Sequence, residues 1–242
     1  MKRMGLALAA LGVATALTGC SDDGGDGGGD GGDFAKGPAQ DIVDAAKSDM
    51  ADLEAVKVSG TVTNDGQEIT IDIQSSAAGD CTGSIGVDDG TAELLGVGGE
   101  TWMKPDEAFW RSFAGESAEQ VLTLVGGKWV VIPAEDDSFN QFCDVDELLD
   151  QLLEDDDDDE STYTVKGTED LDGDEVVLVD NEDPEDGTST GYVLVDAPHY
   201  LVKIEKTDGE DTGSVTFSEF NEEFEVTPPA EDDVVDLESL GS

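Results

Sequence analysis

The chain contains three cysteines, Cys20, Cys81 and Cys143, and their positions are the clearest sign of specific chemistry in the sequence. A thiol can be acylated, oxidised to a disulfide or used as a metal ligand, and its surroundings decide among these outcomes. Cys20 directly follows an apolar segment at the start of the chain, whereas the other two lie far apart within mixed sequence. The two settings predict two different modifications.

Cys20 ends a segment with the order of a secretory signal peptide. Met1-Lys2-Arg3 gives a positive start, and an apolar run follows from Met4 to Leu17. The run is too short, and its flanks are wrong, for a stable transmembrane helix. Leu17-Thr18-Gly19-Cys20 resembles the bacterial lipobox, in which the cysteine is diacylated and becomes the mature N-terminus. We therefore expect residues 1–19 to be removed and lipid on Cys20 to anchor the protein to the extracytoplasmic face of the cell membrane. The alternative is a secreted protein without lipid.

Cys81 and Cys143 remain as an even pair once Cys20 is assigned to lipid. In an oxidising compartment such a pair usually forms a disulfide. Closing a loop of about 60 residues would stabilise the fold by roughly 4 kcal/mol in the chain-entropy model. A redox thiol pair and a metal site are the alternatives. Both are weaker because the chain has no C-x-x-C sequence and a single histidine, His199.

The acidic clusters do not have the spacing of a calcium-binding loop. Asp170, Asp172 and Asp174 alternate, but an EF-hand loop needs glycine at its sixth position and glutamate at its twelfth. In this loop Gly173 precedes Asp174, and the twelfth position is Asn181. A run of aspartates over 155–159 is typical of a solvated face and supports only weak, nonspecific association with divalent ions. We therefore expect no specific metal site and no cofactor.

Catalytic patterns are also weak. A Ser-His-Asp triad would require His199, which lies in Ala197-Pro198-His199-Tyr200, at a predicted turn between two strands. We expect no Gly-x-Ser-x-Gly elbow between a strand and a helix. Carboxylates are too abundant for any pair to identify an acid and a base, and Gly24 to Gly32 contains aspartates that would repel phosphate. The sequence therefore predicts no catalytic residues, and we expect a protein that is not an enzyme.

Charge excludes one class of partner. The 242-residue chain has 60 Asp and Glu against 11 Lys and Arg, a formal net charge of −49. No basic patch is available to neutralise phosphates, so we expect no nucleic acid partner. An anionic membrane surface would also repel the protein, which leaves the acyl chains to hold it there. The charge favours solubility and carries no information about the fold.

Composition divides the chain into three parts. Residues 1–19 are the expected signal peptide, and residues 20–37 are the acylated cysteine followed by a Gly/Asp tether. The tether has almost no apolar residues to bury, so we expect it to be disordered. Residues 38–240 contain no convincing linker and predict a single domain, which we expect to be a monomer.

The first part of this domain has the pattern of one helix followed by a meander of strands. Apolar residues recur at helical spacing after Pro38, and the period then changes to alternation, with Asn64-Asp65-Gly66 as a hairpin turn. Alternation predicts strands with one apolar and one polar face. The predicted elements are a helix over 38–53, strands over 56–62, 69–73, 81–87 and 91–97, and a short strand that ends at 103.

The middle of the chain is helical and the remainder returns to strands. Pro105 is placed in a first helical turn, and the pairs Ser117 with Gln120 and Asp144 with Glu147 have the spacing of capping boxes. The elements predicted here are helices that begin at 105, 117 and 144. A strand over 128–132 lies between the last two helices. Further strands span 163–167, 175–180, 190–196, 200–207 and 213–220, and an extended tail begins at 228.

Strands, then helices, then strands around one core is typical of an α+β fold with a mainly antiparallel sheet. A curved sheet of about ten strands needs a second layer to bury its inner face, and the helical pieces supply that layer. If the helices fit loosely, the remaining volume is a ligand site; if they fit tightly, it is an ordinary core.

Several large apolar residues could line such a volume. Phe109, Trp110, Phe113 and Trp129 are large aromatic side chains of the mature chain, and Leu148 and Leu152 lie on the helix over 144–153. They are candidates for contact with an acyl chain. Core packing is the more common role for aromatic and leucine stripes, and it stays open for these residues.

Short segments spread along the domain resemble the actinobacterial LppX/LprG lipoproteins, which share the fold of the lipoprotein carrier LolA. The resemblance covers most of residues 38–240, and the extreme acidity and long Asp/Gly turns depart from it. The segments, besides the lipobox, tether, opening helix and first hairpin, are Trp102-Met103-Lys104-Pro105-Asp106-Glu107-Ala108-Phe109-Trp110-Arg111, Gly127-Lys128-Trp129-Val130, Ala197-Pro198-His199-Tyr200-Leu201-Val202-Lys203-Ile204, Val215-Thr216-Phe217-Ser218 and Val226-Thr227-Pro228-Pro229.

This resemblance implies a half-barrel whose concave side is closed by helices around an apolar cavity. It also implies that the cavity accepts the acyl chains of a lipid or glycolipid and carries them between membrane layers. A different hypothesis is an interaction or sensor domain that binds no lipid, which would expose a contiguous apolar patch. An enzyme would instead need a pocket with converging polar groups of shifted pKa.

Overall fold

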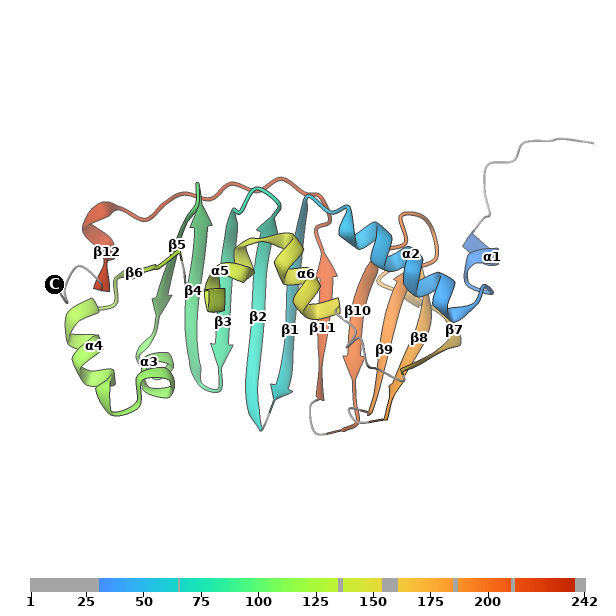
Figure 1. The fold of residues 1–242 in the computed structure, drawn as a ribbon, viewed down its shortest axis with the longest axis horizontal. Helices are drawn as coiled ribbons and strands as arrows, with labels where there is room; N and C mark the ends of the chain where they lie inside the picture. The colour runs from blue at the N-terminus through green and yellow to red at the C-terminus, as the bar shows by residue number, and fades with distance from the viewer. Residues whose placement is uncertain are drawn as a thin grey trace, which may run out of the picture.

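One open, curved sheet is the centre of the structure, a computed structural model that describes residues 31–64, 66–134, 137–153, 161–184, 187–209 and 212–237 (Figure 1). Twelve strands form it within these ranges, in the order β12-β6-β5-β4-β3-β2-β1-β11-β10-β9-β8-β7. Every described pair of neighbouring strands is antiparallel except β12 with β6, which confirms the predicted sheet. The strands are β1 (Ala55–Asn64), β2 (Gln67–Ser76), β3 (Cys81–Val87), β4 (Gly90–Val97), β5 (Glu100–Pro105), β6 (Trp129–Ile132), β7 (Thr162–Leu171), β8 (Asp174–Asp183), β9 (Gly187–Leu194), β10 (Leu201–Lys206), β11 (Thr212–Ser218) and β12 (Val234–Val235).

The sheet consists of two meanders that meet where β1 pairs with β11. Strands β1 to β5 follow one another across one half, and β7 to β11 across the other. Gly60 of β1 lies opposite Val215 of β11 at this seam. A Cβ atom on Gly60 would lie 2.2 Å from the carbonyl oxygen of Ser214, so the two backbones approach too closely for any other residue.

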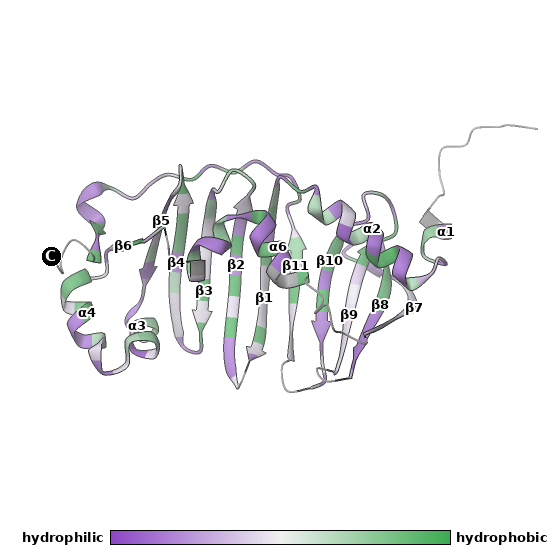
Figure 2. Ribbon diagram, viewed as in Figure 1, coloured by the Kyte–Doolittle hydropathy of each residue, from purple (hydrophilic) through white to green (hydrophobic). Residues whose placement is uncertain are grey.

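Helices cover the concave face of the sheet, and α2 and α6 lie across its middle and its β7 half (Figure 1). Helix α2 is amphipathic, with hydrophobic and hydrophilic residues alternating along it (Figure 2). Its buried residues Ile42, Ala46 and Met50 recur at helical spacing, as predicted. The helices are α1 (Gly31–Phe34), α2 (Ala39–Ala51), α3 (Glu107–Ala114), α4 (Ala118–Val125), α5 (Asp137–Asn140) and α6 (Val145–Leu153), with the short 3-10 helices η1 (Gly115–Ser117), η2 (Gln141–Cys143) and η3 (Glu231–Asp233).

Two hydrophobic cores lie between these layers. The first joins α2 and α6 to the middle strands and the β7 half, and the second joins α3 and η2 to β2 through β6. The Cys81–Cys143 disulfide belongs to the second core and fits the pairing expected from the sequence. Because Cys143 ends η2 directly before α6, the bond fastens the start of that helix to β3. Ser75 also donates a hydrogen bond to the carbonyl oxygen of Phe142.

The helices begin partly at the residues that the sequence predicts. The Asp144 side chain accepts hydrogen bonds from the backbone N–H groups of Asp146 and Glu147, which confirms it as a cap for α6. The capping box at Ser117 is wrong: this residue has helical backbone angles because η1 precedes α4, and its side chain makes no cap hydrogen bond. Pro105 is also misplaced, since it ends β5 and the carboxylate of Asp106 caps α3.

Both ends of the described chain contact the domain. Phe34 of α1 stacks on His199 with ring centroids 3.6 Å apart, so this part of the predicted tether lies against the domain. Cys20 and residues 20–30 lie outside the described residues, as does the acidic run over 155–159. The predicted extended tail passes along the sheet and ends in β12, where Val234 pairs with Trp129 of β6.

Candidate functional site

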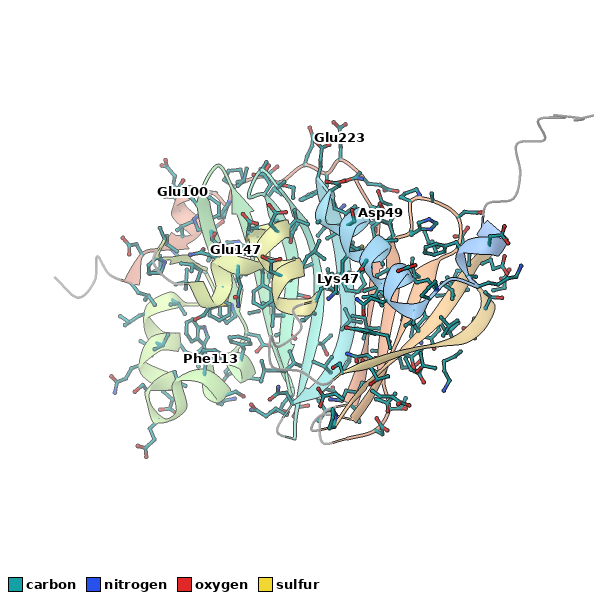
Figure 3. The ribbon with its side chains drawn as sticks, turned by 45° about the vertical axis from the view of Figure 1, so that its right-hand side comes forward. Lys47, Asp49, Glu100, Phe113, Glu147 and Glu223 are labelled. Carbon is teal, nitrogen blue, oxygen red and sulfur yellow. A yellow bond between two sulfur atoms is a disulfide. The ribbon has the colours of Figure 1, made fainter. Side chains whose placement is uncertain are left out.

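A pocket of about 270 Å³ lies between α2 and the concave face of strands β7 to β10. Lys47 of α2 marks this region in Figure 3. Most of the lining side chains are aliphatic, because this face of the strands also supplies the first core. The lining residues are Val43, Ala46, Lys47, Met50, Leu153, Tyr163, Val179, Asn181, Ser189, Gly191, Val193, Leu201 and Ile204.

Gly191 lies on the sheet beneath the pocket and leaves space there. It pairs with Val179 of β8 on one side and with Ile204 of β10 on the other. A Cβ atom on Gly191 would be 3.4 Å from Cδ1 of Leu201, an ordinary van der Waals contact. The backbone therefore does not require glycine at this position, whereas a long side chain would project into the pocket.

A row of polar residues crosses the same face, two residues along the strands from Val179 and Gly191. Strand register places Tyr163 opposite Asn181, Asn181 opposite Ser189, and Ser189 opposite Lys206. Asn181 Oδ1 is buried and accepts no hydrogen bond from any described residue. Its position is unusual because Val177 and Val179 precede it on the same face of β8 and are both buried.

A second hollow of about 190 Å³ continues from the pocket toward β11 and β1. The two share Ser189 and Ile204 in their walls and so lie side by side on the concave face, and we call them together the groove. Val62 of β1 and Val215 of β11 line the far part. The groove therefore extends beyond α2, and its polar side chains lie toward the ends of β8, β9 and β10.

The opposite face of these strands carries a charged network. Asp180 of β8 is only 8% exposed, and its carboxylate accepts one hydrogen bond from Thr190 Oγ1 at 2.8 Å and forms an ion pair with Lys166 Nζ at 2.9 Å. The hydrogen bond and the charge of Asp180 raise the pKa of Lys166. Alternation thus gives each strand one face for the pocket and one for ion pairs.

Tyr192 and Glu205 form a second polar group on that opposite face. The Tyr192 hydroxyl donates a hydrogen bond of 2.9 Å to Glu205, which also accepts one from Lys203. Burial, followed by the hydrogen bond to Glu205, raises the pKa of Tyr192 to about 12. The hydrogen bonds from Lys203 and Tyr192 lower the pKa of Glu205. These shifted groups face away from the pocket and stabilise the sheet.

The aromatic candidates lie away from this pocket. Phe109 is buried in the second core and stacks on Phe113, with ring centroids 5.1 Å apart. Phe113 is 62% exposed, and Figure 3 shows it at the α3 end of the molecule, away from Lys47. The Nε1 atom of Trp110 is buried without a partner among the described residues. None of the three lines the pocket beneath α2.

The α6 candidates lie closer to it. Leu148 is fully buried in the first core and does not line the pocket. Leu152 belongs to α6, but its side chain lies outside those that the structure describes. The next residue, Leu153, does line the pocket. Trp129 is on β6 at the other end of the sheet, where Lys104 lies over its ring.

The order Gly187-Thr188-Ser189-Thr190-Gly191 matches the letters of Gly-x-Ser-x-Gly, but it lies entirely within strand β9 and forms no strand-to-helix elbow. His199 Nδ1 is 3.1 Å from the carbonyl oxygen of Leu194. In the described ranges, no group of three or more His, Cys, Asp or Glu is placed to hold a metal ion. No helix there has the length and apolar character needed to cross a membrane.

Sequence reasoning missed the strand side of the pocket because it followed large apolar residues. The available signal was weaker. Asn181 and Ser189 occupy positions that alternate in phase with Val179 and Val193, so they put polar groups on a face that is otherwise apolar. Gly191 carried no signal, since a glycine in a strand is compatible with several roles.

Comparison with known proteins finds similarity at the level of structure alone. No protein-family model matches the sequence. No curated protein matches it either. The fold must therefore be compared through the solved structures.

Two solved mycobacterial proteins have the same fold. LprF from Mycobacterium bovis superposes with a TM-score of 0.55 at 18% identity, and the match covers 79% of this chain and 97% of that one. The lipoprotein LppX from Mycobacterium tuberculosis gives a TM-score of 0.50 at 16% identity, covering 78% and 98%. The resemblance to LppX/LprG lipoproteins is therefore confirmed for the fold: this chain has the curved sheet and helical cover of LprF and LppX.

Proposed function

We propose that this protein binds the acyl chain of a lipid or glycolipid in the pocket between α2 and strands β7 to β10. The observation that carries the proposal is the pocket itself, a largely aliphatic volume of about 270 Å³ between two layers that otherwise pack closely. Ligand pockets commonly measure about 300–1,000 Å³. This one is near the lower limit, which favours one acyl chain over several.

Burial of methylene groups would supply the affinity. Each CH₂ group removed from water contributes roughly 0.8 kcal/mol, so even a partly inserted chain would bind usefully. The adjacent hollow toward Val62 and Val215 gives further room beside the pocket. No metal or cofactor is needed for such binding, because the interaction is the burial of apolar surface.

The proposed location is the extracytoplasmic face of the cell membrane. Its support is the signal-peptide order and the lipobox at Leu17 to Cys20, followed by a Gly/Asp segment that would act as a tether. With a formal net charge of −49, the protein would be repelled by anionic headgroups and would depend on its own lipid for attachment. The protein would then shield an acyl chain during transfer or present it at the surface, as a monomer.

The lipid contacts predicted from the sequence are a separate proposal, because the α2 pocket is lined by other residues. They are Phe109, Trp110, Phe113, Leu148 and Leu152. Phe113 is the exposed member and, with Leu124 of α4, it puts large apolar side chains on the surface. This pair supports the alternative, an interaction or sensor domain that docks a protein partner and binds no lipid. The two proposals separate cleanly because one requires the α2 pocket and the other requires the α3–α4 end.

The test uses the chain from residue 21 onward, which keeps every described residue. It is secreted from an actinobacterial host, purified without detergent and examined by native mass spectrometry with lipid extraction. A near-stoichiometric lipid adduct supports the proposal and identifies the ligand. An unliganded mass that stays unchanged after added acyl lipids contradicts it, and it directs attention to Phe113 and Leu124.

A further inference from the structure

We propose that the polar row Tyr163–Asn181–Ser189–Lys206 selects amphiphiles whose headgroup is uncharged and carries a hydroxyl, with Asn181 accepting the hydrogen bond of that hydroxyl. The inference rests on the proposed function and specifies its ligand class. It also assigns a direction to the bound ligand, with the headgroup at this row and the acyl chain beneath α2.

Strand register brings the row together. Tyr163, Asn181, Ser189 and Lys206 are consecutive partners across β7, β8, β9 and β10. Three of them line the α2 pocket, and Lys206 lines the hollow that continues from it. The next level of the same face holds Val179, Gly191 and Ile204, which are apolar or lack a side chain. The face therefore changes from polar to apolar between neighbouring residues of the same face, such as Asn181 and Val179.

The side chain of Asn181 requires a partner that the described protein does not supply. Its Oδ1 atom is buried and accepts no hydrogen bond, although the residue lies in the pocket wall. A buried acceptor left without a donor destabilises the fold. A ligand hydroxyl at this position would satisfy that acceptor, whereas an ester or a carboxylate, which have no donor, would not.

The acyl chain then extends toward Met50 and Leu201. Val193 lies beyond Val179 and Gly191 from the polar row, and it lines the pocket with Met50 of α2 and Leu201 of β10. All three of these side chains are buried in the first core. This direction leaves a headgroup near the ends of β8, β9 and β10, where strands give way to turns.

The charge of the chain opposes an anionic headgroup. Lys206 is the one basic member of the row, but Asp183 follows Asn181 on the same face of β8. The carboxylate of Asp208 lies at the same end, where it accepts a hydrogen bond of 2.8 Å from the backbone N–H of Thr188. Lys47 of α2 also lines the pocket, so two carboxylates face two ammonium groups here, and the formal net charge of −49 is what opposes an anionic headgroup.

The experiment compares ligands that share the lauroyl or dodecyl chain and differ in the head. Monolauroylglycerol and dodecyl glucoside supply hydroxyls from glycerol and from sugar, methyl laurate has no donor, and laurate is anionic. Their affinities are measured below micellar concentration for the chain from residue 21 onward. The variants are Asn181→Leu and, as the matched control, Gln74→Leu, since Gln74 is a half-buried amide on the opposite face of β2.

For the unsubstituted chain, we expect at least one hydroxyl ligand to bind about tenfold more tightly than methyl laurate, which corresponds to one buried hydrogen bond. Asn181→Leu should remove this preference without weakening the binding of methyl laurate. Gln74→Leu should leave the preference for the hydroxyl ligand intact. Whichever of monolauroylglycerol and dodecyl glucoside binds more tightly shows whether the site prefers a glycerol or a sugar headgroup. Equal affinity for all four ligands, or tightest binding of laurate, would overturn this inference while leaving acyl-chain binding in place. Failure of all four to bind would overturn both.

Discussion

Gly191 lies against Leu201 at the bottom of the pocket, where a Cβ atom added to the glycine would be 3.4 Å from Cδ1 of the leucine. The contact is ordinary, so a small side chain fits there, but anything longer must extend into the space below α2. The pocket therefore depends on one missing side chain as well as on the distance between the helix and the sheet. This relationship gives a direct way to fill the pocket.

Gly191→Leu should abolish binding of acyl ligands while the fold is retained. Leucine would occupy the volume that the proposed chain needs, and glycine in a strand interior has no side chain to pack, so its replacement should not weaken the strand. Gly191→Ala is the graded control, because its Cβ atom makes normal contacts and leaves most of the volume open. Ligand titration and thermal unfolding measure the two effects. Undiminished binding by a folded Gly191→Leu protein would exclude this pocket as the site.

Reduction of the Cys81–Cys143 bond should lower the free energy of unfolding by roughly 4 kcal/mol, the value expected for a closed loop of this length. Its loss would also free η2 and the start of α6 from β3. Urea unfolding of the chain from residue 21 onward, with and without reductant, measures the change. The double variant Cys81→Ser/Cys143→Ser should be insensitive to reductant. If the unsubstituted protein is equally insensitive, the bond does not contribute to stability.

Gly60→Ala should destabilise the fold by about 3 kcal/mol or more, since the added Cβ atom would meet backbone atoms of Ser214 and Val215 that cannot move aside locally. The seam between the two meanders would have to separate. Gly86→Ala is the matched control, because its Cβ atom would meet a side chain, that of Thr70, at 3.3 Å. Chemical denaturation should rank the two variants in this order, and similar losses would contradict the close approach at the seam.

Tyr192 should make stability depend on pH in alkaline solution. Its pKa of about 12 exceeds the value near 10 expected in the unfolded chain, so the folded protein holds the phenolic proton more tightly. The stabilisation is complete below pH ~10 and is lost as the pH rises toward ~12. The free energy of unfolding should fall more steeply here than it does for Tyr192→Phe. Parallel curves for the two proteins would refute the assignment, and tyrosinate absorbance gives an independent check.

Much of the fold could be predicted from alternation and helical spacing. The meander of β1 to β5 and the apolar face of α2 follow from local patterns, in which each residue reports its own burial. Local patterns do not predict element boundaries and strand pairings that tertiary contacts determine. Pro105 has the sequence position of a helix start, but pairing with Ala92 of β4 extends the strand through it. Val234 and Val235 join β6 from a distant part of the sequence, and no local signal reports such a pairing.

The candidate site was harder to predict than the fold. The size of Phe109 makes it a candidate ligand contact, yet size also favours core packing, and the structure buries it beside Gly90 of β4. The pocket instead depends on Gly191, which has no side chain, and on the fit of α2 over the sheet. How closely two layers approach depends on all their contacts together. A single sequence does not contain that information at any one position.

If the volume beneath α2 holds an acyl chain, filling it should remove the bound lipid. Native mass spectrometry can compare the chain from residue 21 onward with its Gly191→Leu variant, both secreted from the same host and purified without detergent. We expect a near-stoichiometric lipid adduct on the unsubstituted protein and none on the variant. Equal adducts on both proteins, or no adduct on either after incubation with acyl lipids, would contradict this expectation.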